Sequence, residues 1–257
     1  ILESYNKPYE TYNINCLGTL NILEITRHLK TIRSLVCVTS DKCYQSNFST
    51  RGFKETDKLG GNDPYSGSKA SAEIIVNTYI ESFFKNNKMI GVASARAGNV
   101  IGGGDWSPYR IIVDYVNAIE NGVPLEVRNP LATRPWQHVL EPIGGYLILG
   151  SRMHSEEGFD EAWNFGPERS SIVSVQELLA SIESVNGNSD WKDVSTSEQR
   201  HEAQSLSLDI SKAKFQLGWS PALDLNKTVA LTMEWYREYA NGNVKDLCYK
   251  QIEEYTE

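Results

Sequence analysis

The stretch Ser34-Leu35-Val36-Cys37-Val38-Thr39 decides the fold class of this 257-residue chain. It is short, apolar and rich in β-branched residues, which predicts a strand buried in a parallel sheet. In the preceding residues 12–29, apolar side chains recur mostly at three- and four-residue steps, as they do on an amphipathic helix. The order helix, then buried strand, indicates an α/β protein.

The same alternation continues downstream. Apolar residues recur at helical spacing over residues 65–84, residues 89–95 are typical of a further strand, and residues 110–121 predict another helix that Gly122 and Pro124 end. Helices that alternate with strands imply βαβ crossovers. We therefore predict a doubly wound parallel sheet for this part of the chain.

Beyond Pro124 the signals are mixed and predict a smaller α+β lobe. Short strands are expected at 125–128 and 136–139, and helices at 142–149, 173–185, from 209 to Gly218, and 226–239. We expect one domain over residues 1–123 and a second over 124–257, some of whose segments return to the first.

Composition excludes several classes of protein. Hydrophobic residues make up 40% of the chain, which is enough for a sizeable core. The net charge is −8 and the basic residues are dispersed, which argues against nucleic-acid binding. No apolar run reaches 18 residues, so no membrane span is expected. The cysteines form no C-x-x-C pair, which favours a reducing, cytoplasmic setting: they are Cys16, Cys37, Cys43 and Cys248.

Tyr65-Ser66-Gly67-Ser68-Lys69 opens one of the predicted helices. Residues four apart lie on one helix face, so the Lys69 ammonium can approach the Tyr65 phenol. A nearby cation favours the phenolate, which can act as a base. Taken alone, however, a Tyr and a Lys at this spacing are common on solvated helix faces.

A second group of polar residues follows the first predicted strand. Ser40, Asp41 and Lys42 come directly after Thr39, at the carboxyl edge where open α/β sheets bind ligands. The helix that begins at Tyr65 starts from the same edge, so these side chains can share a pocket. The plainer alternative is that Asp41 and Lys42 form an exposed turn pair of little energetic value.

Several longer motifs then identify a family resemblance. They are 39–44 (TSDKCY), Tyr65-x-x-x-Lys69, 95–106 (ARAGNVIGGGDW) and 134–139 (RPWQHV), supported by Asn15-x-x-Gly18-Thr19 and 208–213 (LDISKA). Together they resemble an extended short-chain dehydrogenase/reductase of the NAD-dependent epimerase/dehydratase type. The resemblance implies a Rossmann-type NAD-binding domain with a nucleotide-sugar lobe.

The same resemblance exposes a departure. Members of the family open with a strand, a Gly-x-x-Gly-x-x-Gly loop and a helix that hold the dinucleotide pyrophosphate. Gly102-Gly103-Gly104 has neither the spacing nor the position of that loop, and the chain begins with Ile1. We expect a C-terminal portion of a longer enzyme, with about 90 to 100 residues preceding it, and hence an inactive fragment.

For the intact enzyme the resemblance implies dehydration of a nucleotide-linked hexose, with CDP-glucose as the expected substrate and NAD as cofactor. Tyr65 would take the O4 proton, Lys69 would assist it and hold the nicotinamide ribose, and Asp41 would protonate the departing O6 hydroxyl. Lys42 stands where related enzymes have a Glu that removes the C5 proton. It could be that base, if neutral, or it could position the substrate.

The resemblance also assigns binding roles. Asn15 would lie on the cofactor side, and Ser40 would hydrogen-bond the sugar O4. The residues expected on the substrate side are Ser40, Asn99, Arg134 and Asn164. Arg134 could instead stack on Trp136 or another ring, and Asn164 precedes Phe165 and Gly166, where turn chemistry is an equal explanation. Several relatives place an arginine that binds phosphate near the position of residues 200–204. Here Ala203 and Gln204 lie near that point, so the resemblance does not assign phosphate binding to this stretch.

Metal ligation is not expected, because the histidines lack ligand spacing: they are His28, His138, His154 and His201. The resemblance further implies a homo-oligomer, a dimer or larger, in which the Tyr65 helix and the preceding helix pack on a partner. Two alternatives remain: another nucleotide-sugar epimerase, dehydratase or reductase of the same family, and a cofactor-free module that only binds or assembles.

Overall fold

The computed structural model describes residues 1–45, 51–85, 89–187, 190–195 and 206–257. The chain divides into two compact units. Unit one comprises residues 1–98, 142–166 and 207–220, and unit two comprises 99–141, 167–206 and 221–257. The first division lies at Gly98, ahead of residue 123, because strand Asn99–Ile101 pairs within unit two.

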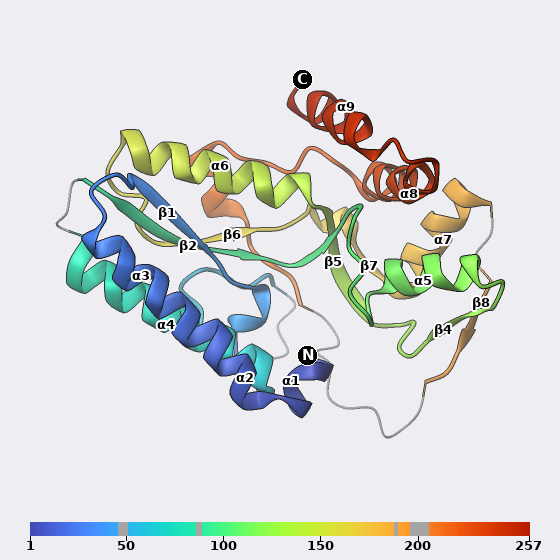
Figure 1. The fold of residues 1–257 in the computed structure, drawn as a ribbon, viewed down its shortest axis with the longest axis horizontal. Coiled ribbons are helices and arrows are strands. Elements are labelled where there is room, and N and C mark those ends of the chain that lie inside the picture. The colour runs from blue at the N-terminus through green and yellow to red at the C-terminus, as the bar shows by residue number, and fades with distance from the viewer. Residues whose placement is uncertain (46–50, 86–88, 188–189, 196–205) are drawn as a thin grey trace. The chain divides into compact units, whose positions relative to one another are not determined.

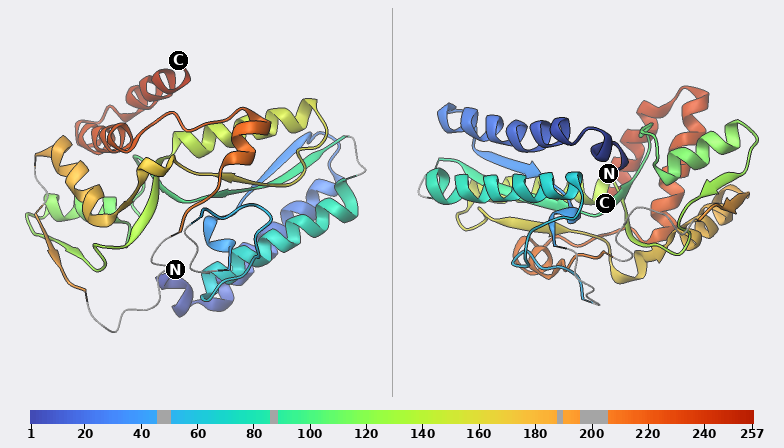
Figure 2. Two further views of the ribbon diagram at one scale, coloured as in Figure 1. Left: turned by 180° about the vertical axis from the view of Figure 1, so that it is seen from behind. Right: turned by 90° about the horizontal axis from the view of Figure 1, so that it is seen from below.

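Unit one has the alternating elements of an α/β fold. In chain order they are α1 (Leu2–Asn6), α2 (Pro8–Tyr12), α3 (Gly18–His28), β1 (Ser34–Val38), α4 (Pro64–Tyr79), β2 (Gly91–Ala97), most of α6 (Leu140–Ser155) and β6 (Ala162–Phe165). The strand order is β1-β2-β6 and both pairings are parallel. The predicted parallel sheet is therefore confirmed. The views in Figure 1 and Figure 2 agree that α3 and α4 lie side by side on one face of this sheet, while α6 covers the other (Figures 1 and 2).

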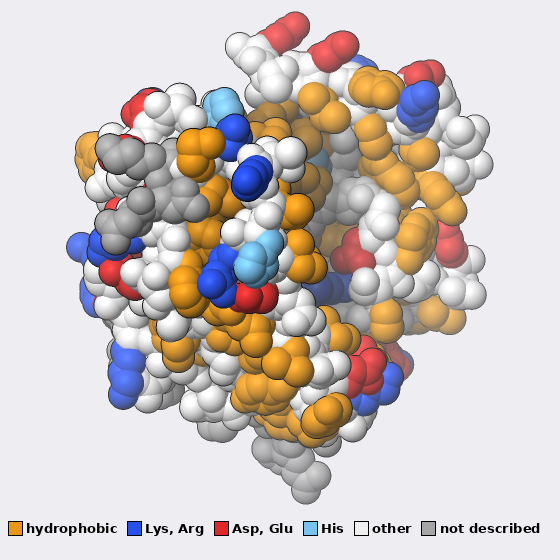
Figure 3. All heavy atoms as spheres, turned by 60° about the vertical axis from the view of Figure 1, so that its left-hand side comes forward, with side chains coloured by type: hydrophobic (Ala, Val, Ile, Leu, Met, Phe, Trp, Pro, Cys, Tyr) orange, Lys and Arg blue, Asp and Glu red, His pale blue; other side chains and the backbone are white. Residues whose placement is uncertain are grey.

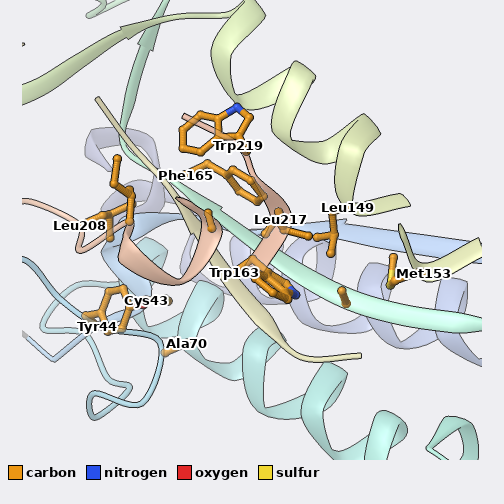
Figure 4. Packing of buried hydrophobic residues seen from close by; sticks show 14 residues of the cluster. Cys43, Tyr44, Ala70, Leu149, Met153, Trp163, Phe165, Leu208, Leu217 and Trp219 are labelled. Carbon is orange, nitrogen blue, oxygen red and sulfur yellow. The ribbon is translucent and has the colours of Figure 1, made fainter. Parts of the chain in front are cut away.

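One core cluster of unit one fills the space between the sheet and α6. Trp163 and Phe165 of β6 are fully buried and pack with Leu149 and Met153 of α6 (Figure 4). Gly145 allows this close approach, because a Cβ there would lie 2.4 Å from the Phe165 ring. Residues 142–149 were expected to form a helix, and the observed helix runs further because Met153 also joins the core.

A second cluster lies on the α3 and α4 side. Leu23, Val76 and Phe84 are buried there beneath Val92 of β2. The opposite faces of these helices stay exposed and apolar. Figure 3 shows hydrophobic side chains gathered over α3 in the lower half of the face drawn. The exposed members along this stretch include Ile14, Leu17, Ile22, Ile25, Ile74 and Phe83.

Unit two combines short strands with helices, as the mixed signals predicted. Its elements are β3 (Asn99–Ile101), α5 (Ile111–Glu120), β4 (Leu125–Val127), β5 (Thr133–His138), β7 (Ile172–Ser174), α7 (Val175–Asn186), β8 (Trp191–Asp193), α8 (Leu225–Asn241) and α9 (Val244–Thr256). β3 pairs parallel with β5, β5 antiparallel with β7, and β4 parallel with β8.

The predicted end of the helix over residues 110–121 is confirmed. α5 ends at Glu120, and Gly122 follows with a φ of +62° that favours glycine. Ser174 caps α7 in a reciprocal capping box with Glu177. Among the described residues, the helices are all too short or too polar to cross a membrane.

Candidate active site

The segment after β1 forms a compact polar turn. Asp41–Cys43 makes a short 3-10 helix, and the Ser40 hydroxyl accepts a hydrogen bond from the backbone N–H of Lys42 at 3.2 Å. Ser40 Oγ in turn donates to Asp41 Oδ1 at 3.1 Å. Ser40 and Asp41 are both buried, at 6% and 1% exposure, so the structure places them in an enclosed environment and not in an exposed turn.

Asp41 is the most chemically unusual member of this turn. Its Oδ1 also receives the Lys42 ammonium at 3.2 Å, whereas its Oδ2 is buried and has no hydrogen-bond partner among the described residues. A buried carboxylate oxygen without a partner is costly, and such groups call for an explanation such as an absent ligand. The Lys42 side chain remains 27% exposed, so the pair can reach a bound molecule.

Tyr65 and Lys69 lie in the first turns of α4. Asp63 caps this helix, accepting hydrogen bonds from Ser66 N at 3.0 Å and Ser66 Oγ at 2.6 Å, and Pro64 occupies its first position. The Lys69 ammonium lies 6.0 Å from the centre of the Tyr65 ring. Both side chains are half-buried, and no described residue forms a hydrogen bond with the Tyr65 hydroxyl or the Lys69 ammonium.

The turn that carries Asp41 and the helix that carries Tyr65 pack against each other. The structure therefore brings five predicted catalytic residues together in unit one: Ser40, Asp41, Lys42, Tyr65 and Lys69. A free phenol, a free ammonium and an unpartnered carboxylate oxygen form a donor and acceptor set that fits a dinucleotide ribose and a sugar.

Asn15 reaches the same helix from a π-helical turn, Asn13–Leu17. Its Nδ2 donates to Ser68 Oγ at 2.9 Å, and Ser68 Oγ donates to the Tyr65 carbonyl at 2.7 Å. Asn15 therefore contacts the stretch between Tyr65 and Lys69, and it does so through Ser68.

The Asn164 side chain is held by hydrogen bonds within unit one. It is fully buried, its Oδ1 accepts from the Tyr44 hydroxyl at 2.7 Å, and its Nδ2 donates to the carbonyls of Phe53 at 2.8 Å and Asp209 at 3.2 Å. Both amide protons are used, so this side chain links β6 to residues 44, 53 and 209 of unit one.

Asn99 and Arg134 lie in unit two, on the neighbouring strands β3 and β5. Asn99 faces Trp136 in the register, and its Oδ1 is buried with no hydrogen-bond partner in the part of the chain that the structure describes. Arg134 pairs with Val173 across β5 and β7, and its Nη1 donates to the Thr133 carbonyl at 2.9 Å. The stretch 200–204 lies outside the described residues.

Part of the Gly-Gly-Gly-Asp-Trp motif has a packing role in unit two. A Cβ on Gly103 would lie 1.9 Å from the Trp235 ring, and the Asp105 carbonyl accepts from the Tyr236 hydroxyl at 2.6 Å. Trp106 packs edge-on against Tyr236. The motif therefore packs against α8.

Two buried charged residues of unit one are not predicted by any sequence motif. Glu73 of α4 and Arg96 of β2 form an ion pair at 2.5 Å, and each is at most 3% exposed. Burial opposes the charge on Arg96, but Glu73 outweighs it, with smaller help from Cys43 and Tyr44, and the pKa of Arg96 is raised. A charge within the apolar stretch 90–97 was the available signal, because such a residue needs a buried partner.

The described residues contain no cluster of His, Cys, Asp and Glu that could hold a metal ion. His138 is buried in unit two, where burial lowers its pKa to about 4.

The chain is similar to known proteins over most of its length. The sequence pattern of the GDP-mannose 4,6 dehydratase family matches residues 1–232. The chain is 39% identical over 253 residues to the CDP-glucose 4,6-dehydratase of Salmonella typhimurium, covering 96% of this chain and 70% of that protein. It is 24% identical to the human dTDP-D-glucose 4,6-dehydratase, covering 91% of this chain and 65% of that protein.

Solved structures agree. The dTDP-glucose 4,6-dehydratase of Bacillus anthracis, solved in complex with NAD, is 25% identical with a TM-score of 0.75, covering 92% of this chain and 71% of that one. The chain thus spans about two thirds of the length of the relatives it matches. From the family pattern and the Salmonella relative together, the chain belongs to the GDP-mannose 4,6 dehydratase family, a family of nucleotide-sugar 4,6-dehydratases within the extended short-chain dehydrogenases/reductases.

Proposed function

We propose that this chain carries the acid–base residues of a CDP-glucose 4,6-dehydratase, which converts CDP-glucose to CDP-4-keto-6-deoxyglucose and water. The observation that supports this most is the buried Asp41–Lys42 pair with its open Oδ2, beside the helix of Tyr65 and Lys69. An epimerase that acts only at C4 has less need for an acid and a base at C5 and C6. The 39% identity to the Salmonella enzyme supports CDP-glucose as the substrate.

NAD, when bound, supplies a hydride acceptor at C4 and a hydride donor at C6. The nicotinamide end of NAD would be held by Tyr65 and Lys69 of α4, and by Asn15, which contacts α4 through Ser68. Tyr65, as phenolate, takes the proton from O4 as C4 is oxidised. The Lys69 ammonium stabilises the phenolate and donates to the ribose hydroxyls.

The next step removes water across C5 and C6. The new C4 ketone acidifies the C5 proton. The Asp41–Lys42 pair holds one proton, and moving it across the 3.2 Å contact converts carboxylate and ammonium into carboxylic acid and amine. The Lys42 amine then takes the C5 proton, while the Asp41 acid protonates O6, which leaves as water. Asp41 and Lys42 end the elimination as carboxylate and ammonium. As C6 receives the hydride, the Lys42 ammonium would return a proton to C5. Lys42 then regains a proton from solvent while Tyr65 releases the proton taken from O4, so the protons balance.

Ser40 donates to the sugar O4, and we assign binding of the nucleotide diphosphate to Asn99 and Arg134. Amide and guanidinium N–H groups are suitable donors for paired phosphate oxygens. Asn164 keeps a supporting role, because its amide protons already bind Phe53 and Asp209. The described residues hold four free thiols, Cys16, Cys37, Cys43 and Cys248, which favours the cytoplasm.

A homodimer is the proposed assembly, formed through the apolar outer faces of α3 and α4. Ile25 and Ile74 are 55% and 56% exposed there, and contiguous apolar surface marks an interaction site. Replacing Ile25 with Glu should convert the dimer to monomer in analytical ultracentrifugation. An unchanged sedimentation coefficient would refute this face as the interface.

The reaction is tested with the purified full-length protein, NAD and CDP-glucose, with UDP-glucose and dTDP-glucose as competing substrates. We expect a 4-keto-6-deoxy product from CDP-glucose at the highest kcat/KM. A product epimerised at C4, or no product, would refute the dehydratase assignment.

Lys42→Arg tests the base. Arginine keeps the positive charge beside Asp41 but does not lose its proton. We expect kcat to fall roughly 100-fold or more, as far as in Lys42→Met. If Lys42→Arg retains most of the activity, Lys42 only positions the substrate.

A further inference from the structure

A buried ion pair lies one helical turn beyond the catalytic lysine of α4. Glu73 follows Lys69 by four residues, and its carboxylate receives the Arg96 guanidinium of β2 at 2.5 Å. Both side chains are nearly inaccessible, at 2% and 3% exposure. Neither residue has a role in the chemistry assigned above.

The pair holds the start of the catalytic turn. Thr39, the residue directly before Ser40, donates its hydroxyl hydrogen bond to Glu73 Oε1. Its backbone N–H is fixed as well, by the Ala95 carbonyl of β2 at 2.8 Å. Glu73 therefore links the carboxyl end of β1 to the helix that carries Tyr65 and Lys69.

The same pair also holds the end of that turn. Arg96 Nη1 donates to the Tyr44 hydroxyl at 2.8 Å, and its guanidinium lies 4.9 Å from the centre of the Tyr44 ring. Tyr44 is the residue that closes the Asp41–Cys43 turn. The Tyr44 hydroxyl in turn donates a hydrogen bond to Asn164 Oδ1 at 2.7 Å.

We propose that Glu73 and Arg96 form a positioning clamp, which fixes both ends of the Ser40–Cys43 turn against the helix of Tyr65 and Lys69. This inference rests on the proposed function, because dehydration needs Tyr65 at C4 and the Asp41–Lys42 pair at C5 and C6 of one sugar. Small misplacements of reacting groups cost large factors in rate. The competing explanation is a pair that contributes only to stability, as buried ion pairs can.

Two substitutions, each of which removes one hydroxyl group that donates to Glu73, separate these explanations. Thr39→Val removes the hydroxyl that ties the turn to Glu73, whereas Ser94→Ala removes the β2 hydroxyl that donates to Glu73 Oε2 at 2.8 Å. Both leave the ion pair in place, and both delete one buried hydrogen bond to the same carboxylate. Only Thr39 adjoins the catalytic turn.

In the full-length protein we expect Thr39→Val to lower kcat roughly 10- to 100-fold with little change in KM. Ser94→Ala should keep kcat within about twofold. Its melting temperature should fall by about as much as that of Thr39→Val. Thr39→Ser, which keeps the hydroxyl, should restore kcat. Equal kcat losses in Thr39→Val and Ser94→Ala, or none in either, would overturn the clamp.

A second readout keeps this result distinct from failure of the proposed function. Amide hydrogen exchange of the peptide covering residues 39–45 should speed up in Thr39→Val and stay unchanged in Ser94→Ala. If the wild-type protein does not dehydrate CDP-glucose, the proposed function fails, and exchange alone then decides the clamp. Unchanged exchange in Thr39→Val contradicts it.

Discussion

Acid pH should destabilise unit two through one buried imidazole. His138, at the end of β5, is 2% exposed, and its Nδ1 accepts from the backbone N–H of Leu140 at 3.4 Å. Its Nε2 forms no hydrogen bond with any described residue. Burial lowers its pKa from 6.5 to about 4. Protonation would occur at Nδ1, so the ring would become a buried charge and would no longer accept the Leu140 N–H.

The sign follows from proton uptake. Between the two pKa values the unfolded chain holds the proton and the folded chain does not, so stability falls as the pH is lowered from about 6.5 towards 4. Each unit of pKa difference is about 1.4 kcal/mol, so His138 should remove about 2 kcal/mol of stability between about pH 7 and pH 5.

Urea unfolding, measured at intervals across this pH range, gives the test. Buried carboxyl groups such as Glu141 and Asp160, whose pKa values are raised by burial, act in the opposite direction. The comparison is therefore with His138→Asn, which keeps an acceptor for Leu140 but cannot titrate. The wild-type protein should lose about 2 kcal/mol more than this variant on acidification. Parallel curves for the two proteins would refute the reasoning.

Two further predictions concern packing and buried hydrogen bonds. Gly145→Ala should lower the free energy of unfolding by about 1–3 kcal/mol, because its Cβ would lie 2.4 Å from the Phe165 ring, while Gly150→Ala on the same helix should cost little, since its Cβ meets nothing closer than 3.7 Å. Equal urea midpoints for the two variants would contradict this. Glu141→Ala should cost about 2–4 kcal/mol, because Glu141 is fully buried and accepts the N–H groups of residues 222 and 223. An unfolding midpoint within error of that of the wild-type protein would contradict this prediction.

The sequence was sufficient where periodicity and turn chemistry agree. The stretch Ser34–Thr39 indicated a buried parallel strand, and β1 pairs with β2 in that way. Residues 209–218 indicated a capped helix, and Asp209 does accept from Ser211 N, with Gly218 at a φ of +70° after the helical turns. These are local signals, and local geometry satisfies them.

The sequence was insufficient where contacts are non-local. The three side-chain partners of Asn164 come from residues 44, 53 and 209, whose proximity no periodicity reveals. Glu73 escaped notice because an acidic residue on an amphipathic helix is ordinarily solvated. Its partner Arg96 lies in the next strand along the chain.

The candidate site divides in the same way. The motif spacing predicted Tyr65, Lys69 and the Asp41–Lys42 pair as site residues, because each set lies on one short element. The open Oδ2 of Asp41 could not be foreseen, since it depends on Ser40 and Lys42 both binding Oδ1. That asymmetry leaves Oδ2 without a hydrogen bond from the described residues.

The most direct test of the 4,6-dehydratase assignment follows the hydrogen on C4 of the sugar. CDP-glucose carrying deuterium at C4 is incubated with the full-length protein and NAD, and the product is examined by NMR. The account predicts CDP-4-keto-6-deoxyglucose with the deuterium in its C6 methyl group. Deuterium that remains at C4, as in an epimerised sugar, would contradict it.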